Sequence, residues 1–111
     1  RIWCIFQPHT YTRTKILLED FSQAFDYADI IIVTDIYAAR EADSWEVNSQ
    51  LLVEKIRQHG KNAIYIKDFE SIVDYLAQNT REGDLVITMG AGDIYRVGEL
   101  FLDIKEPLAV S

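Results

Sequence analysis

The chain has 111 residues and a mass of 12.8 kDa, which suits one domain with one core and is too small for two. Its formal net charge of -7 opposes binding to polyphosphate backbones and anionic lipids, so nucleic acid and membrane are not expected as partners. The hydrophobic share of 49% is that of a folded protein and excludes a disordered chain.

The sequence shows neither a membrane helix nor a signal peptide. No apolar run approaches the roughly 20 residues that cross a bilayer, and the chain opens on Arg1 without a leader. We therefore expect a cytoplasmic protein. The one cysteine, Cys4, lies in an apolar run, which predicts a buried, reduced thiol.

Four short runs rich in β-branched residues predict strands, at residues 2–6, 30–34, 63–66 and 85–89. The first, second and fourth runs are apolar almost throughout. That pattern is typical of parallel strands that are covered on both faces.

Segments with helical spacing lie between these runs. Their apolar positions are Leu17, Phe21, Ala24 and Ala28 in the first, Leu51, Leu52 and Ile56 in the second, and Phe69, Ile72, Val73, Leu76 and Ala77 in the third. Gly60 marks the end of the second helix, and Asp68 caps the start of the third. A fourth helix is expected from about 94 to 101, while residues 103–111 form either a last short strand or a tail.

Strands that alternate with helices over short connections predict a parallel sheet with right-handed crossovers. The expected fold of the single domain, residues 1–111, is therefore α/β: a Rossmann-like open sheet, mainly parallel, with helices on both faces in three layers. Ligands bind such sheets beyond the carboxyl ends of the strands. We expect His9, Asp35, Asp68 and Gly92, which each follow a strand, to lie along one edge.

The loop at residues 7–14 places hydrogen-bond donors around the start of a helix. Backbone N–H groups there favour anions, and a guanidinium binds a carboxylate or phosphate through two hydrogen bonds. These donors are compatible with an anion site made by His9, Thr10 and Arg13. The alternative is that Thr10 or Thr12 only caps the helix and that Arg13 is solvated.

Asp35 follows the second strand, where a carboxylate accepts from a ribose hydroxyl, binds an amine or forms an Asx-turn. Tyr37 begins a connection of about ten residues, longer than the median, and such loops are often functional. The loop also holds Arg40, Glu41, Asp43 and Trp45, of which the tryptophan is either a packing anchor or part of a site.

After the fourth strand come Gly90, Gly92 and Asp93, but Tyr95 stands where the dinucleotide fingerprint needs its third glycine. The glycines favour a tight turn that another backbone or a ligand approaches closely. No glycine precedes a Lys-Ser or Lys-Thr pair, so a phosphate loop is absent. His9 and His59 lack ligands at metal-binding spacing, so no metal site is predicted.

Three of these segments resemble motifs of one family, in order and at fitting separations: residues 6–14, 35–41 and 89–94. They are similar to the C-terminal domain of the Mur ligases, in the branch that joins L-alanine to UDP-N-acetylmuramate. The family usually has proline where Ala38 stands, and some members have arginine where Thr10 stands.

The resemblance implies a lobe of a three-domain, ATP-dependent amide ligase of peptidoglycan synthesis, with the phosphate loop and most ATP and Mg contacts in the other domains. It implies that His9, Thr10 and Arg13 bind substrate on domain closure. Asp35, Tyr37, Gly90, Gly92 and Asp93 then supply nucleotide or loop contacts, and this lobe alone is expected to be inactive.

Two other functions stay open at this point. One is a self-contained Rossmann-like module that binds a small anion without catalysis, and the other is a structural interaction domain with inert loops. The preference among small amino acids, the oligomeric state and the interdomain geometry are not indicated by the sequence.

Overall fold

The computed structural model describes residues 1–38, 47–90 and 92–110. Strands and helices alternate along the chain. They are β1 (Ile2–Phe6), α1 (Tyr11–Ile16), α2 (Leu18–Gln23), β2 (Ile30–Val33), α3 (Ser49–Gln58), β3 (Ala63–Tyr65), α4 (Phe69–Asn79), β4 (Leu85–Met89) and α5 (Tyr95–Val110).

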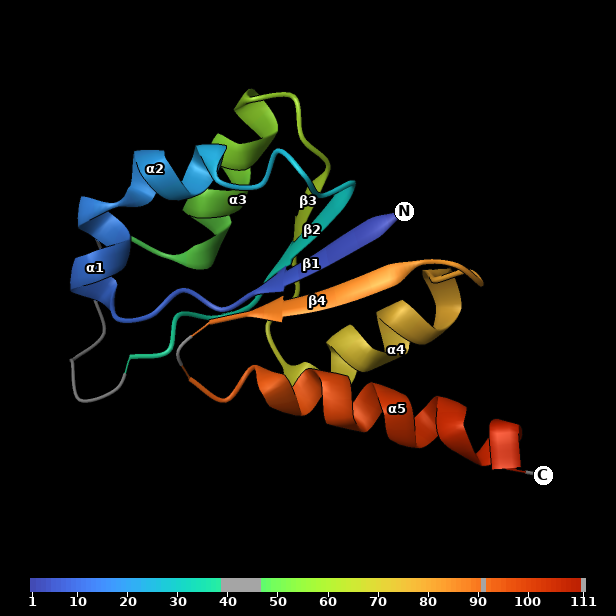
Figure 1. The fold of residues 1–111 in the computed structure, drawn as a ribbon. Coiled ribbons are helices and arrows are strands. Elements are labelled where there is room, and N and C mark those ends of the chain that lie inside the picture. The colour runs from blue at the N-terminus through green and yellow to red at the C-terminus, as the bar shows by residue number, and fades with distance from the viewer. Residues whose placement is uncertain (39–46, 91, 111) are drawn as a thin grey trace.

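The four strands form one sheet in the order β3-β2-β1-β4, and every pair in it is parallel. The expected α/β class and the four strands are thus confirmed, with β2 and β3 each one residue shorter than expected. Figure 1 shows α2 and α3 over one face of this sheet and α4 and α5 over the other.

Alternate residues of the central strand divide between two cores, because successive side chains of a strand point to opposite faces. Cys4 and Phe6 join the core beneath α2 and α3. Trp3 and Ile5 join the core beneath α4 and α5. The sheet is therefore covered on both faces, which gives the three layers and explains why β1 is apolar along its length.

The helix expected through Leu17, Phe21, Ala24 and Ala28 is wrong as one element. The chain breaks at Leu17, where φ is -102° and ψ is 15°, and α2 ends at Gln23. The backbone N–H groups of Ala24 and Ala28 donate to carbonyls three residues back, which makes tight turns. Ala24 is exposed, whereas Phe25 and Ala28 are buried from these turns without one continuous helix.

The other helix boundaries agree more closely with the sequence. The Asp68 carboxylate caps α4 by accepting from the Ser71 N–H at 3.0 Å, and Gly60 follows α3 with a φ of 79°. The last helix, α5, continues to Val110, so residues 103–110 are neither a strand nor a tail. The expectation of a strand or tail rested on Pro107, which disfavours a helix interior, but the helix includes this residue within four positions of its end.

Candidate functional site

The loops after all four strands lie at one edge of the sheet, as expected for parallel strands (Figure 1). Along this edge the order is Asp68, Asp35, His9 and Gly92, which confirms the predicted juxtaposition. Strand β2 lies on one side of β1, and the later strand β4 lies on the other side of β1. The topological switch point, where ligands bind such sheets, therefore lies between the ends of β1 and β4.

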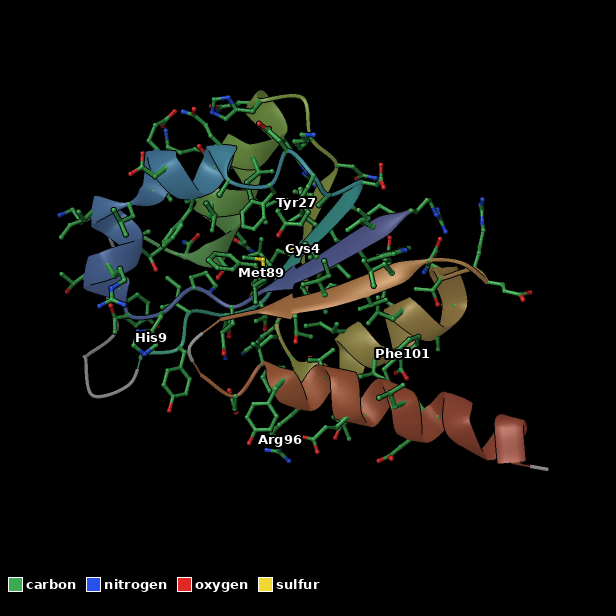
Figure 2. All side chains as sticks on the ribbon, in the orientation of Figure 1. Cys4, His9, Tyr27, Met89, Arg96 and Phe101 are labelled. Carbon is green, nitrogen blue, oxygen red and sulfur yellow. The ribbon has the colours of Figure 1, made fainter. Side chains whose placement is uncertain are left out.

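The first two loops are tied together by their backbones. The Tyr37 N–H donates to the Pro8 carbonyl at 2.8 Å, and the Thr10 N–H donates to the Tyr37 carbonyl at 2.8 Å. These bonds hold the rings of His9 and Tyr37 in a stack, with centroids 5.6 Å apart and an interplanar angle of 13°. Figure 2 shows His9 beyond the carboxyl end of β1.

Thr10 caps α1, as the alternative interpretation of this loop predicts. Its Oγ1 accepts from the Arg13 N–H at 3.2 Å, and its carbonyl accepts from the Thr14 hydroxyl at 2.7 Å. The Thr10 backbone has φ 60° and ψ 148°, a conformation that a residue with a Cβ rarely adopts. The cap is thus made at the cost of local backbone strain.

Arg13 is exposed beside a surface hollow of about 390 Å³. The hollow is lined by Thr10, Thr12, Arg13, Ile16 and Leu17. The dipole of α1 contributes less to anion binding than expected, because α1 has only six residues and Arg13 also belongs to its last turn. The guanidinium beside the hollow, rather than the helix dipole, is the feature suited to an anion.

Asp35 contacts the neighbouring strand. Its carboxylate accepts a hydrogen bond from the Tyr65 hydroxyl, a partner that no sequence motif indicated. Burial, followed by this bond, raises the pKa of Tyr65 to about 12, so the phenol stays protonated. Arg40, Glu41, Asp43 and Trp45, expected in the same loop, lie outside the described residues.

The two glycines after β4 make the close approach that the sequence predicts. A Cβ at Gly90, whose φ is 154°, would lie 2.9 Å from the Gln7 carbonyl oxygen. A Cβ at Gly92 would lie 2.7 Å from the Gln7 Oε1 and 2.8 Å from the Tyr37 ring. The fourth loop therefore packs directly on the first two, across the switch point.

Gln7 is the residue at this edge that sequence reasoning missed. Its side chain is only 5% exposed, and its Nε2 donates to the Asp93 carboxylate at 3.1 Å. Its Oε1 is buried and accepts no hydrogen bond, and the Nδ1 of His9 is likewise buried without a partner. Gln7 lies in the loop and in the motif that the sequence analysis singled out, but nothing there distinguished it as a site residue.

Cys4 is buried and unpaired, as expected. Burial raises the pKa of its thiol, and a contact with the Tyr27 hydroxyl opposes that shift. In Figure 2 the side chains of Cys4, Tyr27 and Met89 gather on one face of the sheet. Among the described residues, no three His, Cys, Asp or Glu side chains gather as for a metal, and no helix has the length and hydrophobicity of a membrane span.

The chain is similar to known ligases. The sequence profile of the Mur ligase family's glutamate ligase domain matches residues 1–92. The UDP-N-acetylmuramate--L-alanine ligase of Acetivibrio thermocellus is 61% identical over 111 residues, all of this chain and 24% of that protein. The enzyme of the same name from Caldanaerobacter subterraneus subsp. tengcongensis is 64% identical over 103 residues, 93% of this chain and 22% of that protein.

A solved structure has the same fold. The crystal structure of a UDP-N-acetylmuramate-alanine ligase from Thermotoga maritima aligns with a TM-score of 0.73 at 22% identity, over 96% of this chain and 20% of that one. The chain thus spans about a quarter of the length of the relatives that it matches.

Proposed function

The chain belongs to the Mur ligase family, and on that premise we propose that it forms the C-terminal lobe of an ATP-dependent ligase that adds L-alanine to UDP-N-acetylmuramate in peptidoglycan synthesis. The observation that carries the proposal is the 61% identity, along the whole chain, to a relative named for this reaction. The matched region covers the whole chain, so it spans the loops of the carboxyl edge as well as the core.

The reaction needs groups that this lobe does not supply. In the parent ligase ATP phosphorylates the muramoyl carboxylate, and the amine of alanine then attacks the acyl carbon and releases phosphate as the amide bond forms. The described residues gather no metal ligands, and the sequence has no phosphate loop. Magnesium and most of the ATP contacts are therefore assigned to the remainder of the parent.

The lobe's own contribution is to bind and orient substrates along its carboxyl edge. Arg13 beside its hollow is suited to a substrate carboxylate or phosphate, because a guanidinium makes paired, charge-assisted hydrogen bonds with such groups. His9 and Thr10 belong to the same loop. The adjoining wall is formed by Asp35, Tyr37, Gly90, Gly92 and Asp93, which would contact the nucleotide or hold the neighbouring loops in place when the domains close.

The ligands of the proposed reaction also fit the charge of the chain. Nucleotides and amino acids are small polar molecules, and a net charge of -7 opposes long anionic polymers without preventing a local guanidinium from binding one anion. We place the parent ligase in the cytoplasm, where ATP and nucleotide-linked sugars are available.

The proposal is tested in the parent ligase by deleting residues 1–111 and following amide formation with UDP-N-acetylmuramate, L-alanine and ATP. We expect ligation to be lost while the remaining domains still bind ATP. Undiminished ligation by the truncated enzyme would refute the proposal. Tight binding of inorganic pyrophosphate by the 111-residue chain, in a parent that lacks ligase activity, would instead favour an anion-binding module.

A further inference from the structure

Two buried polar atoms without hydrogen-bond partners occur in the same loop, Oε1 of Gln7 and Nδ1 of His9. The two residues are two positions apart, and both of their side chains lie near the ring of Tyr37. Buried polar groups in folded proteins are nearly always hydrogen-bonded, so an unpaired one needs an explanation. The location of this pair at the switch point suggests a ligand.

The orientation of the Gln7 carboxamide is fixed by Asp93. A carboxylate accepts hydrogen bonds, so the amide must present its NH₂ group to Oδ1 of Asp93, as it does at 3.1 Å. Flipping the amide would place two acceptor oxygens against each other. Oε1 therefore remains an acceptor facing Gly92, with no donor supplied by the described protein.

The ring of Tyr37 covers this acceptor. The point where a Cβ of Gly92 would lie is 2.7 Å from Oε1 of Gln7 and 2.8 Å from two carbons of the ring, so the three groups meet there. The same ring stacks on His9. The Tyr37 backbone is held by two hydrogen bonds, but its side chain is 39% exposed. Rotation of the Tyr37 side chain about its Cα–Cβ bond would move the ring and leave these backbone hydrogen bonds in place.

We propose that Tyr37 covers a subsite for a primary ammonium group, in which Oε1 of Gln7 is the buried acceptor and Asp93 supplies the opposing charge. An ammonium group carries up to three N–H donors and a positive charge, which match a carbonyl oxygen beside a carboxylate. This inference rests on the proposed function and identifies the group as the ammonium of the amino-acid substrate. The ring of Tyr37 then moves away from Oε1 of Gln7 when the amino acid enters.

The other donor available in the reaction is the amino group of adenine. It also donates N–H bonds, but it is neutral and gains nothing from the charge of Asp93. The structure therefore favours the amino acid, and the two sources are separated by measuring each substrate independently.

The test uses the parent ligase with Gln7→Met, which keeps the length of the side chain and removes its carbonyl. We expect the KM for L-alanine to rise about tenfold, because a site built around a hydrogen bond loses affinity when one partner is removed. The inhibition constant of L-alaninol, which keeps the ammonium and lacks the carboxylate, should rise in step. The KM for ATP and inhibition by propionate, which lacks the ammonium, should stay unchanged.

Two further variants keep the result interpretable. Gln78→Met is the matched control, an exposed glutamine on α4, and should change none of these values. Asp93→Asn removes the charge at a less buried position and should also raise the KM for L-alanine, which preserves the test if Gln7→Met fails to fold. A rise in the KM for ATP alone would assign the acceptor to adenine and overturn the ammonium subsite.

The subsite would also be overturned if both variants kept the KM for L-alanine and the inhibition constant of L-alaninol of the unmodified enzyme. A fall in kcat alone, with these two constants unchanged, would overturn it as well. Failure of the proposed function is a separate outcome, because the unmodified parent would then form no alanine amide at all.

Discussion

The Cα of Gly92 lies so close to the ring of Tyr37 that a Cβ at position 92 would come within 2.8 Å of two ring carbons. We predict that Gly92→Ala destabilises the domain by about 1–3 kcal/mol, because overpacking forces neighbouring groups to move. The change is measured by urea unfolding of the 111-residue chain.

Gly98→Ala is the matched control for Gly92→Ala. Gly98 lies within α5 and has no atom within 4 Å of the place where a Cβ would stand. Alanine there should stabilise the chain by about 0.5–1 kcal/mol, since glycine is the poorer residue in a helix. If Gly92→Ala were as stable as the unmodified chain, the loop that holds Gly92 would not pack closely on Gln7 and Tyr37.

Acid should destabilise the domain through Asp84. The Arg81 N–H, the Trp3 indole and the Arg1 guanidinium donate to its carboxylate, at 2.9, 2.9 and 3.1 Å, and hold the pKa of Asp84 well below its usual range. A carboxyl group whose pKa is lowered by folding contributes stability above its unfolded pKa, near 3.9, and loses it as the pH falls. The urea midpoint should therefore decrease below about pH 4.

Asp84→Asn should remove part of this pH dependence, while Asp74→Asn, an exposed carboxylate on α4, should leave it in place. Identical slopes for the unmodified chain and Asp84→Asn between pH 5 and pH 3, approximately the range in which carboxylates titrate, would contradict the assignment.

Thr10 stabilises α1 as its N-cap but has a strained backbone, and two substitutions distinguish these two effects on stability. Thr10→Ala loses the cap and keeps the strain, so it should destabilise the chain by about 1 kcal/mol. Thr10→Gly also loses the cap, at a cost of only a few tenths of a kcal/mol, but relieves strain of about 1–3 kcal/mol. We expect the glycine variant to be at least as stable as the unmodified chain in urea unfolding.

Asn48 provides the comparison for Thr10. It caps α3 by accepting from the Leu51 N–H at 2.8 Å, and its φ of -152° is ordinary extended backbone. Glycine at position 48 therefore relieves no strain and should not stabilise the chain. A destabilisation by Thr10→Gly as large as that by Thr10→Ala would mean that the Thr10 backbone is not strained.

The sheet and its edge were predictable from the sequence because strand periodicity and burial depend on local residue types. The runs beginning at Ile2 and Leu85 were found with their observed bounds, and parallel strands necessarily bring their following loops to one edge. The helix through Leu17 was misassigned because an apolar residue at helical spacing, such as Ala28, is also buried from a turn.

The contacts across the edge were not predictable, because they join residues far apart in sequence. Gln7 bonds Asp93, 86 positions away, and Asp35 bonds Tyr65, 30 positions away. Nothing in the local pattern of a glutamine or a tyrosine shows which distant carboxylate it will meet. The candidate site could be located from the sequence, but its hydrogen-bond partners could not.

The 111-residue chain alone should form no amide and release no phosphate from ATP, because phosphoryl transfer depends on phosphate and metal ligands that its described residues do not gather. Phosphate release is measured with UDP-N-acetylmuramate, L-alanine, ATP and magnesium all present. Alanine-dependent release above a buffer control, retained through a second purification, would show that the lobe contains a complete active site.

Arg13→Ala in the parent ligase should impair ligation far more than folding. The Arg13 side chain is exposed beside the surface hollow next to α1. The cap made by Thr10 uses the Arg13 backbone N–H, which alanine retains. A charge-assisted bond to substrate contributes about 1.5–3 kcal/mol, so kcat/KM for L-alanine or ATP should fall roughly tenfold to a hundredfold. Arg96→Ala, an exposed arginine on α5 across the sheet from α1 (Figure 2), should change neither property. Unaltered kinetics beside a large fall in the thermal midpoint of the Arg13→Ala chain would make Arg13 a structural residue.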